Sequence, residues 1–181
     1  MNSLARNRLV FSCAFGALAA SVLICAIASA PVHADDASCK PISDAMMKQA
    51  NTPYHEIAMA DGKKSVEKIY TTHALYIGMR GHWTKTPMTS QDVIDLTRET
   101  GASFSNCRSL RTETVDGQVA TVYAVLIQTT TPASSSDTQI WLSNASGLPL
   151  KTEAVTQAGD RKVHVSAHFD HGNVQPPAGV N

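Results

Sequence analysis

The most distinctive pattern in the chain is a stretch with apolar residues on both faces, between Gln118 and Thr131. From 119 to 127 the odd positions carry Val, Thr, Tyr, Val and Ile, whereas the even positions carry Ala, Val, Ala and Leu. β-Branched and aromatic residues favour a strand, and the run is shorter than a buried helix would need. A strand that is apolar on both faces is covered on both sides. Because one face is small and smooth and the other is larger, we expect a helix against one side and a different element against the other.

Turn signals divide the second half of the chain into antiparallel strands. Asp116-Gly117 is typical of a two-residue type I′ hairpin, and it joins the segments 104–115 and 118–131. Regular alternation predicts another strand at 161–170, after a turn at Gly159-Asp160. We also expect strands at 139–142 and 150–158, a turn at 144–147, a polar loop at 132–136, and an extended tail from Gly172.

The first half is predicted to begin with a helix and to continue as a meander. In residues 40–51 the small and apolar side chains recur at helical spacing, with Pro41 in the first turn and Asn51 at the end. Four strand-like segments follow at 54–60, 63–72, 73–80 and 82–86, and Asp61-Gly62 joins the first two. Together these segments indicate an α+β fold.

A second, short helix is predicted after these strands. Met88-Thr89-Ser90 opens it and Gly101 closes it. Its weak apolar stripe consists of Val93, Leu96, Thr97 and Thr100.

The first 34 residues have the pattern of a secretory signal peptide. Arg6 and Arg8 give a basic start, an apolar run extends from 9 to 28, and Val32-His33-Ala34 offers the small residues that a signal peptidase reads. We therefore expect cleavage after Ala34 and a single domain in residues 35–181. A retained membrane anchor is the alternative, but the Ala, Ser and Gly content of the run favours a cleaved signal. We expect no other membrane-spanning segment.

Removal of this segment changes the charge and the cysteine count. Because Arg6 and Arg8 leave with it, 13 of the 15 basic residues face 15 acidic ones, and no basic surface for nucleic acid is indicated. Of the four cysteines only Cys39 and Cys107 remain, and such a pair in an exported protein normally forms a disulfide. A redox or metal-binding pair is the alternative, but it lacks CxxC spacing.

The sequence lacks the common motifs of catalysis and cofactor binding. It has no Gly-rich phosphate loop, GxSxG, HExxH or CxxC. His164 and His168 share a face of their predicted strand but lie about 13 Å apart, too far to hold one ion. His168, Asp170 and His171 could meet at the strand end, yet the regular alternation of this segment favours a solvated polar face. We therefore expect no metal, no cofactor and no enzymatic activity.

Two tryptophans and a group of apolar residues are candidates for lining a ligand cavity. A core position is the commoner role for each tryptophan. The apolar faces of the predicted strands nevertheless exceed what two short helices can cover, so a curled sheet would leave a cavity suited to an acyl chain. A closed sandwich with these residues in its core is the alternative. The candidate lining consists of Tyr70, Leu75, Tyr76, Ile77, Met79, Trp83, Tyr123, Val125, Ile127 and Trp141.

The C-terminal part resembles a known family. Ile140-Trp141-Leu142 precedes Ser146-Gly147-Leu148-Pro149-Leu150-Lys151 and Glu153, and the last strand ends in Phe169-Asp170 before Asn173-Val174 and a proline-containing tail. This series resembles LolA/LolB-like (lipoprotein localisation factor-like) proteins, in which a tryptophan-bearing strand turns through Gly-Leu-Pro-Leu-Lys. The resemblance implies a curved antiparallel sheet that forms an incomplete, half β-barrel, covered by the N-terminal helix and the short second helix.

The resemblance also implies a function. The family includes lipoprotein carriers, a lipoprotein-sensing regulator of envelope stress and mycobacterial lipid carriers. We therefore expect a periplasmic, monomeric, non-catalytic carrier whose partner is a lipid or an acylated protein. An envelope protein-interaction or stress-sensing module on the same scaffold is the alternative.

Overall fold

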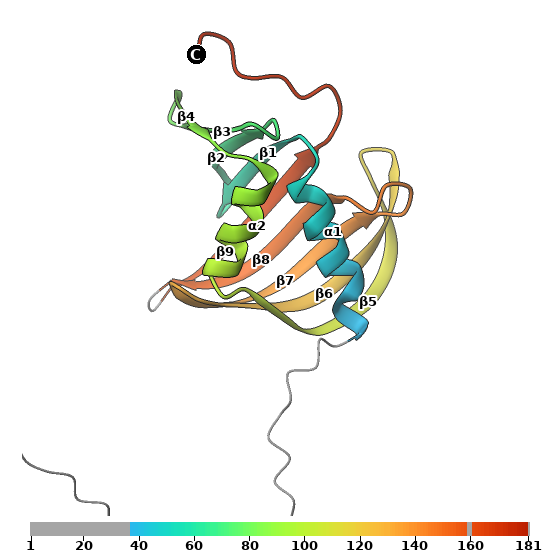
Figure 1. Ribbon diagram of the computed structural model, residues 1–181. Coiled ribbons are helices and arrows are strands. Elements are labelled where there is room, and N and C mark those ends of the chain that lie inside the picture. The colour runs from blue at the N-terminus through green and yellow to red at the C-terminus, as the bar shows by residue number, and fades with distance from the viewer. Residues whose placement is uncertain (1–36, 159–160, 181) are drawn as a thin grey trace, which may run out of the picture. The chain divides into compact units, whose positions relative to one another are not determined.

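Two antiparallel meanders joined side by side make up the sheet of this protein. The computed structural model describes residues 37–158 and 161–180 (Figure 1). Within these residues it contains the nine strands β1 (Tyr54–Ala60), β2 (Lys63–Tyr70), β3 (Ala74–Met79), β4 (His82–Pro87), β5 (Ser103–Val115), β6 (Gln118–Thr130), β7 (Ala133–Ser143), β8 (Pro149–Ala158) and β9 (Arg161–Asp170). Their order in the sheet is β4-β3-β2-β1-β9-β8-β7-β6-β5. The antiparallel pairing of β1 with β9 joins the first meander to the second.

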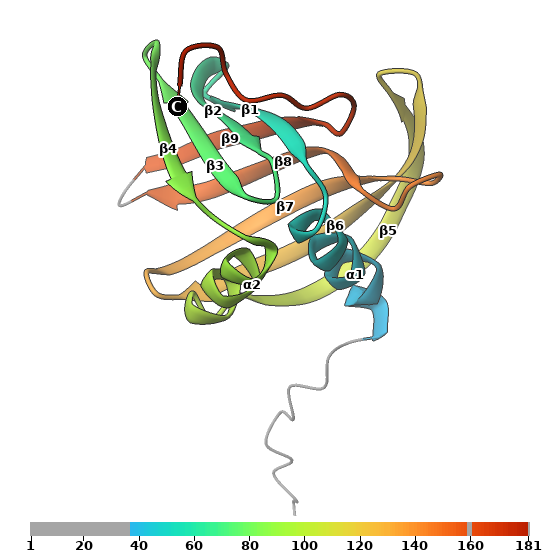
Figure 2. The ribbon, with the colours of Figure 1, turned by 45° about the horizontal axis from the view of Figure 1, so that its top comes forward.

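The two helices lie on the same face of this open sheet (Figures 1 and 2). A short 3-10 turn (Ala37–Cys39) leads into α1 (Lys40–Ala50), and α2 (Ser90–Glu99) links β4 to β5. Because β4 and β5 are the two edges of the sheet, the segment between them has to cross the sheet, and α2 makes that crossing. The predicted α+β half-barrel with two covering helices is confirmed.

Alternation along the strands gives the sheet two distinct faces, which we call the inner and outer face. The inner face carries the helices: its residues Val125, Ile140 and Leu142 form one buried cluster with Cys39, Ile42 and Ala45. The outer face of β5–β8 has its own cluster, in which Val122 and Trp141 are buried. The prediction that a helix covers one side of the strand at 118–131 is confirmed, whereas on the other side the cluster is made by side chains of the neighbouring strands and not by a separate element.

The outer face of β2–β4 is covered by the C-terminal tail. Val174 and Val180 pack against a buried group formed by Ile69, Ala74 and Tyr76. The tail therefore returns over the first meander after β9, and its end lies beside β3 and β4 (Figure 2).

Two details of the sequence-based prediction are wrong. The predicted polar loop at 132–136 belongs to β7, which begins at Ala133, because its serines pair with the end of β6. The predicted stripe of α2 included Leu96, but that side chain is 50% exposed, while Val93 and Ile94 are half-buried. The short polar side chains in the first case and the two possible helix registers in the second gave ambiguous patterns.

Two predictions concern residues that the structure does not describe. The signal peptide (1–34) and the turn at Gly159-Asp160 lie outside the described residues. Among the residues that are described, no helix has the length and apolar character that crossing a membrane requires.

Candidate functional site

An apolar pocket lies between the two helices and the inner face, and we call it the interhelix pocket. Its volume is about 380 Å³. Most of its walls are hydrocarbon or aromatic side chains from α1, α2 and the beginnings of β1 and β5. The described residues that line it are Met46, Met47, Gln49, Ala50, Tyr54, Val93, Ile94, Thr97, Arg98, Ala102 and Phe104.

The disulfide and the core fix α1 as one wall of this pocket. Cys39, immediately before the helix, is bonded to Cys107 of β5 with a Cα–Cα distance of 5.0 Å, which confirms the predicted pairing. Ile42 and Ala45 are buried against the sheet. On this amphipathic helix, the face that includes Met46 and Gln49 is left for the pocket.

The second helix begins at a capping box. The Thr89 hydroxyl accepts a hydrogen bond from the Asp92 amide at 3.3 Å, and the Asp92 carboxylate accepts one from the Thr89 amide at 2.7 Å. These bonds satisfy amide groups that a helix start otherwise leaves free. The hydrogen bonds that the Thr89 amide and then the Thr89 hydroxyl donate to the Asp92 carboxylate lower the pKa of Asp92. Local sequence therefore defines where α2 starts, although the helix has no buried residue of its own.

Tyr70 connects both helices to the sheet. Its side chain is almost fully buried, and its hydroxyl donates a hydrogen bond to the carbonyl oxygen of Ala50, the last residue of α1, at 3.0 Å. The same hydroxyl lies 3.4 Å from the hydroxyl of Ser90, the first residue of α2. One side chain of β2 thus holds the junction where the two helices meet.

Tyr54 forms the centre of an aromatic group at the pocket wall. Its ring centroid lies 5.5 Å from that of Tyr70, 6.0 Å from that of Phe169 and 6.3 Å from that of His171. Burial, and then the neighbouring Glu56 carboxylate, raise the pKa of Tyr54 above its ordinary value. The hydroxyl therefore stays protonated and is available as a hydrogen-bond donor.

Seven of the ten predicted lining residues lie on the inner face. Strand register places Tyr70, Leu75, Ile77 and Met79 there in the first meander, and Tyr123, Val125 and Ile127 in the second. Tyr70 and Tyr123 belong to different meanders, and Tyr123, Val125 and Ile127 pack with the cluster beneath α1. Their contact with a ligand stays a prediction.

The other three predicted residues lie on the outer face. Tyr76 pairs with Ile69, and Trp83 packs with Tyr76 beside the C-terminal tail. Trp141 pairs with Val122, on the side of β7 away from α1. The register of each strand decides this, because a shift of one residue exchanges the two faces.

Trp141 is held on the outer face by charged neighbours. Its indole nitrogen donates a hydrogen bond to the Glu113 carboxylate at 2.6 Å, and Lys151 Nζ lies 4.6 Å from the ring centroid. Arg111 forms an ion pair with Glu113 and lies 5.9 Å from the same ring centroid. The bond from Trp141, and then that from Arg111, lower the pKa of Glu113. This arrangement is a structural anchor for the outer face.

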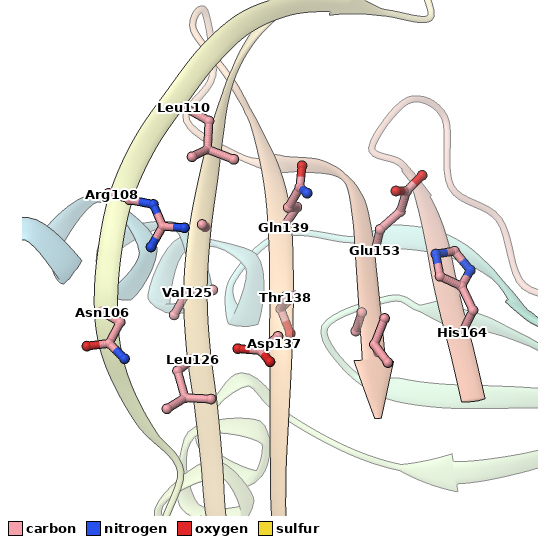
Figure 3. Close-up of a pocket in the computed structure, with 13 residues that line it drawn as sticks. Asn106, Arg108, Leu110, Val125, Leu126, Asp137, Thr138, Gln139, Glu153 and His164 are labelled. Carbon is pink, nitrogen blue, oxygen red and sulfur yellow. The ribbon is translucent and has the colours of Figure 1, made fainter. Parts of the chain in front are cut away.

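A polar groove lies on the outer face beside Trp141 and its charged neighbours (Figure 3). It crosses β5–β9, has a volume of about 380 Å³, and mixes charges of both signs with Leu110, Leu126 and Val155. Arg108 from β5, Asp137 from β7, Glu153 from β8 and His164 from β9 all line it. This mixture does not provide the continuous apolar wall that an acyl chain needs.

The histidines that the structure describes lie apart from any metal-binding group of side chains. Within the described residues no group of three or more His, Cys, Asp or Glu side chains could hold an ion. His171 instead lies between backbone carbonyls, with Nε2 2.8 Å from the Pro149 oxygen and Nδ1 3.3 Å from the Pro53 oxygen.

Comparison with known proteins adds a likeness of fold. No protein-family model matches the chain, and neither does any curated protein. The structure is similar to that of the lipoprotein LppX of Mycobacterium tuberculosis, with 10% sequence identity, a TM-score of 0.49, and coverage of 78% of this chain and 99% of that one. It is also similar to LprF of Mycobacterium bovis (9% identity, TM-score 0.46, 77% of this chain and 95% of that one). A further similar structure is that of the hypothetical lipoprotein YmcC of Escherichia coli, with 12% sequence identity, a TM-score of 0.38, and coverage of 68% of this chain and 89% of that one.

The open, helix-covered sheet is the half-barrel that the resemblance to LolA/LolB-like proteins implied. None of the ten predicted lining residues is among the described residues that line the interhelix pocket, because the prediction considered strand residues and most of this lining belongs to α1 and α2. The signal was present as two pairs of adjacent apolar residues, Met46 and Met47 in α1 and Val93 and Ile94 in α2, although Met46 also packs against the inner cluster. Met47 is exposed, so it could not have been assigned to the core.

Proposed function

We propose that this protein is a non-catalytic periplasmic carrier that holds the acyl chain of a lipid or of an acylated protein in the interhelix pocket. The single observation that carries the proposal is the apolar lining of that pocket between two helices and the sheet. Its volume of about 380 Å³ falls within the range of roughly 300–1,000 Å³ that is usual for small-molecule sites.

The way in which the two helices are attached to the sheet is consistent with a pocket that opens by movement of α2. α2 has no buried residue, and α1 is fixed at its N-terminal end by the disulfide. The methionines of α1 also suit a lipid pocket, because an unbranched side chain adapts to ligands of different shape. Loading would then require a shift of α2 and no unfolding of the core.

Ligand uptake by two matched variants tests this function. Ile94→Asp places a charge in the pocket wall, whereas Leu96→Asp places the same charge on the same helix outside the lining. After delipidation, the wild type and Leu96→Asp should take up a fluorescent fatty acid, and Ile94→Asp should lose at least tenfold in affinity, because an acyl chain that binds there would remove water from the new carboxylate.

Circular dichroism controls for the fold of each variant. Co-purified lipid identified by mass spectrometry would support the proposal directly. A wild-type protein that carries no lipid and takes up no fatty acid would overturn it.

Export and oligomeric state are separate parts of the proposal. N-terminal sequencing of protein recovered from the periplasm should give Asp35 as the first residue. Light scattering should give the mass of a monomer. An uncleaved N-terminus would refute the predicted signal, and a stable dimer would refute the monomer.

A protein-interaction role is the second candidate, and the outer groove is the observation that favours it. Arg108, Asp137 and His164 line this groove and form no ion pair with other described residues. A partner that binds there should be retained after delipidation and lost in Arg108→Glu. Loss of the partner on delipidation would favour the carrier function.

A further inference from the structure

We infer that the interhelix pocket selects single-chain amphiphiles with an anionic carboxylate head group, and that Arg98 at the pocket wall recognises this group. The inference rests on the proposed function and specifies its ligand class. Among the eleven described residues that line the pocket, Arg98 is the only charged one. An apolar pocket with one cation in its wall complements a ligand with one chain and one negative charge.

Arg98 has N–H donors that make no hydrogen bond with another described residue. Its side chain is 73% exposed, and one nitrogen, Nη1, lies 2.7 Å from an oxygen of Asp95. A guanidinium group has five N–H donors in a planar fork that matches a carboxylate. Arg98 can therefore bind a ligand carboxylate without losing its contact with Asp95.

The ion pair with Asp95 is also easy to exchange. Exposed pairs of this kind contribute little to stability. Asp95 has a second partner on the same helix, since the Gln91 amide donates to it at 3.0 Å. If Arg98 turns toward a ligand, the Asp95 carboxylate keeps a hydrogen-bond donor.

Two neutral polar groups at the pocket wall favour the same ligand. Neither the Gln49 side chain nor the Tyr54 hydroxyl makes a hydrogen bond with another described residue. Both can donate to a head-group oxygen. They come from α1 and β1, whereas Arg98 comes from α2, so an oxygen-rich head group has donors on different walls.

A buried carboxylate of the inner face, that of Glu56, is already paired with a lysine. Glu56 is buried beside Tyr54, but its two oxygens lie 2.9 Å and 3.1 Å from Lys68 Nζ. The pair is close to neutral as a whole. A ligand carboxylate therefore meets no uncompensated negative charge from this group.

Two probes with the same chain separate the head group from the tail. Isothermal titration calorimetry of delipidated protein with laurate and with dodecanol measures the ratio of their affinities. The wild type should bind laurate more tightly, by up to about fivefold, which is the effect of an exposed ion pair. Arg98→Gln should remove this preference, with a larger loss in laurate affinity than any change in dodecanol affinity.

Two further variants sharpen the test. Arg108→Gln removes an arginine from the outer groove and should keep the wild-type ratio. Asp95→Asn frees Arg98 from its partner and should raise the ratio. Equal affinity of the wild type for both probes, or an unchanged ratio in Arg98→Gln, would overturn the head-group inference alone. Absence of binding by both probes would overturn the proposed function and this inference with it.

Discussion

Ile140 and Trp141 are neighbours in β7 and are almost equally buried, with 1% and 2% of their surface exposed. They face opposite sides of the sheet, and different parts of the chain cover them. Ile140 packs in the inner cluster with Cys39 and Ile42, from the segment before β1. Trp141 packs in the outer cluster, whose other members come from β5, β6 and β8.

The outer face therefore depends on contacts between consecutive strands, and the inner face depends on contacts with a helix that is distant in the sequence. The outer cluster is made by strands that follow one another in the sequence, so hairpin formation is enough to assemble it. The inner cluster needs a helix from far along the chain, and the disulfide holds that helix in place. The ligand pocket that we propose lies on the inner face, between the sheet and the helices that cover it.

Truncation of Trp141 is expected to have the largest effect on stability. Trp141→Ala removes a buried ring and leaves the Glu113 carboxylate without the indole donor, so the free energy of unfolding should fall by about 3–5 kcal/mol. Urea denaturation followed by circular dichroism measures this loss. Trp83→Ala is the control, because Trp83 is only half-buried. A loss no greater than that of the control would contradict the role of Trp141 as an anchor.

Removal of the disulfide should weaken the inner face selectively. The double substitution Cys39→Ser and Cys107→Ser should cost about 2–4 kcal/mol and lower Tm by several degrees, because the unfolded chain gains freedom. Trp141 emission in the folded state should stay as in the wild type, since its cluster contains no residue of α1. An unchanged Tm, or a shifted emission maximum, would break the distinction between the two faces.

Loss of one hydroxyl should loosen the helix junction. Tyr70→Phe removes the hydrogen bond to the Ala50 carbonyl and should reduce stability by about 1 kcal/mol. Affinity for a fluorescent fatty acid should change at the same time, because both helices line the pocket. Tyr123→Phe is the matched control, since the Tyr123 hydroxyl makes no hydrogen bond with another described residue. Equal behaviour of the two variants would show that Tyr70 does not position the helices.

The smallest expected effect is the pH dependence of the stability that the Glu113 carboxylate contributes on the outer face. The pKa of Glu113 is lowered from its ordinary value of 4.5, so its contribution to stability is present above that value and is lost as pH falls through the lower folded-state pKa. Glu113→Gln should therefore be less stable than the wild type at neutral pH, and the difference should shrink below pH 4.5. Melting curves of both proteins across this range measure it. A difference that is constant with pH would mean that the carboxylate charge is not involved.

Much of the fold could be read from local signals. Asp61-Gly62 and Asp116-Gly117 were recognised as hairpin turns, and both have the positive φ angles that such turns require. The helix at Ser90 was predicted from the opening Met88-Thr89-Ser90 and the closing Gly101, and its start has a capping box between Thr89 and Asp92. The pairing of Cys39 with Cys107 followed from having one pair of cysteines in a chain that is expected to be exported. Each of these signals is contained in a few neighbouring residues or in a count.

The candidate site was predicted less well because it depends on several elements at once. An alternating strand does not reveal which of its faces a helix will cover, so Tyr76, Trp83 and Trp141 could not be separated from Tyr70 and Tyr123 in advance. The interhelix pocket also depends on how far apart two helices lie, and no periodicity encodes that distance.

The sequence by itself determined the strands, the turns, the helix starts and the disulfide, because short-range sterics and hydrogen bonds specify them. Only the tertiary structure decided the identity of the inner face and the placement of Arg98 beside an apolar pocket. Both follow from the crossing of α2 between the two edges of an open sheet, a contact between residues that are distant in the chain.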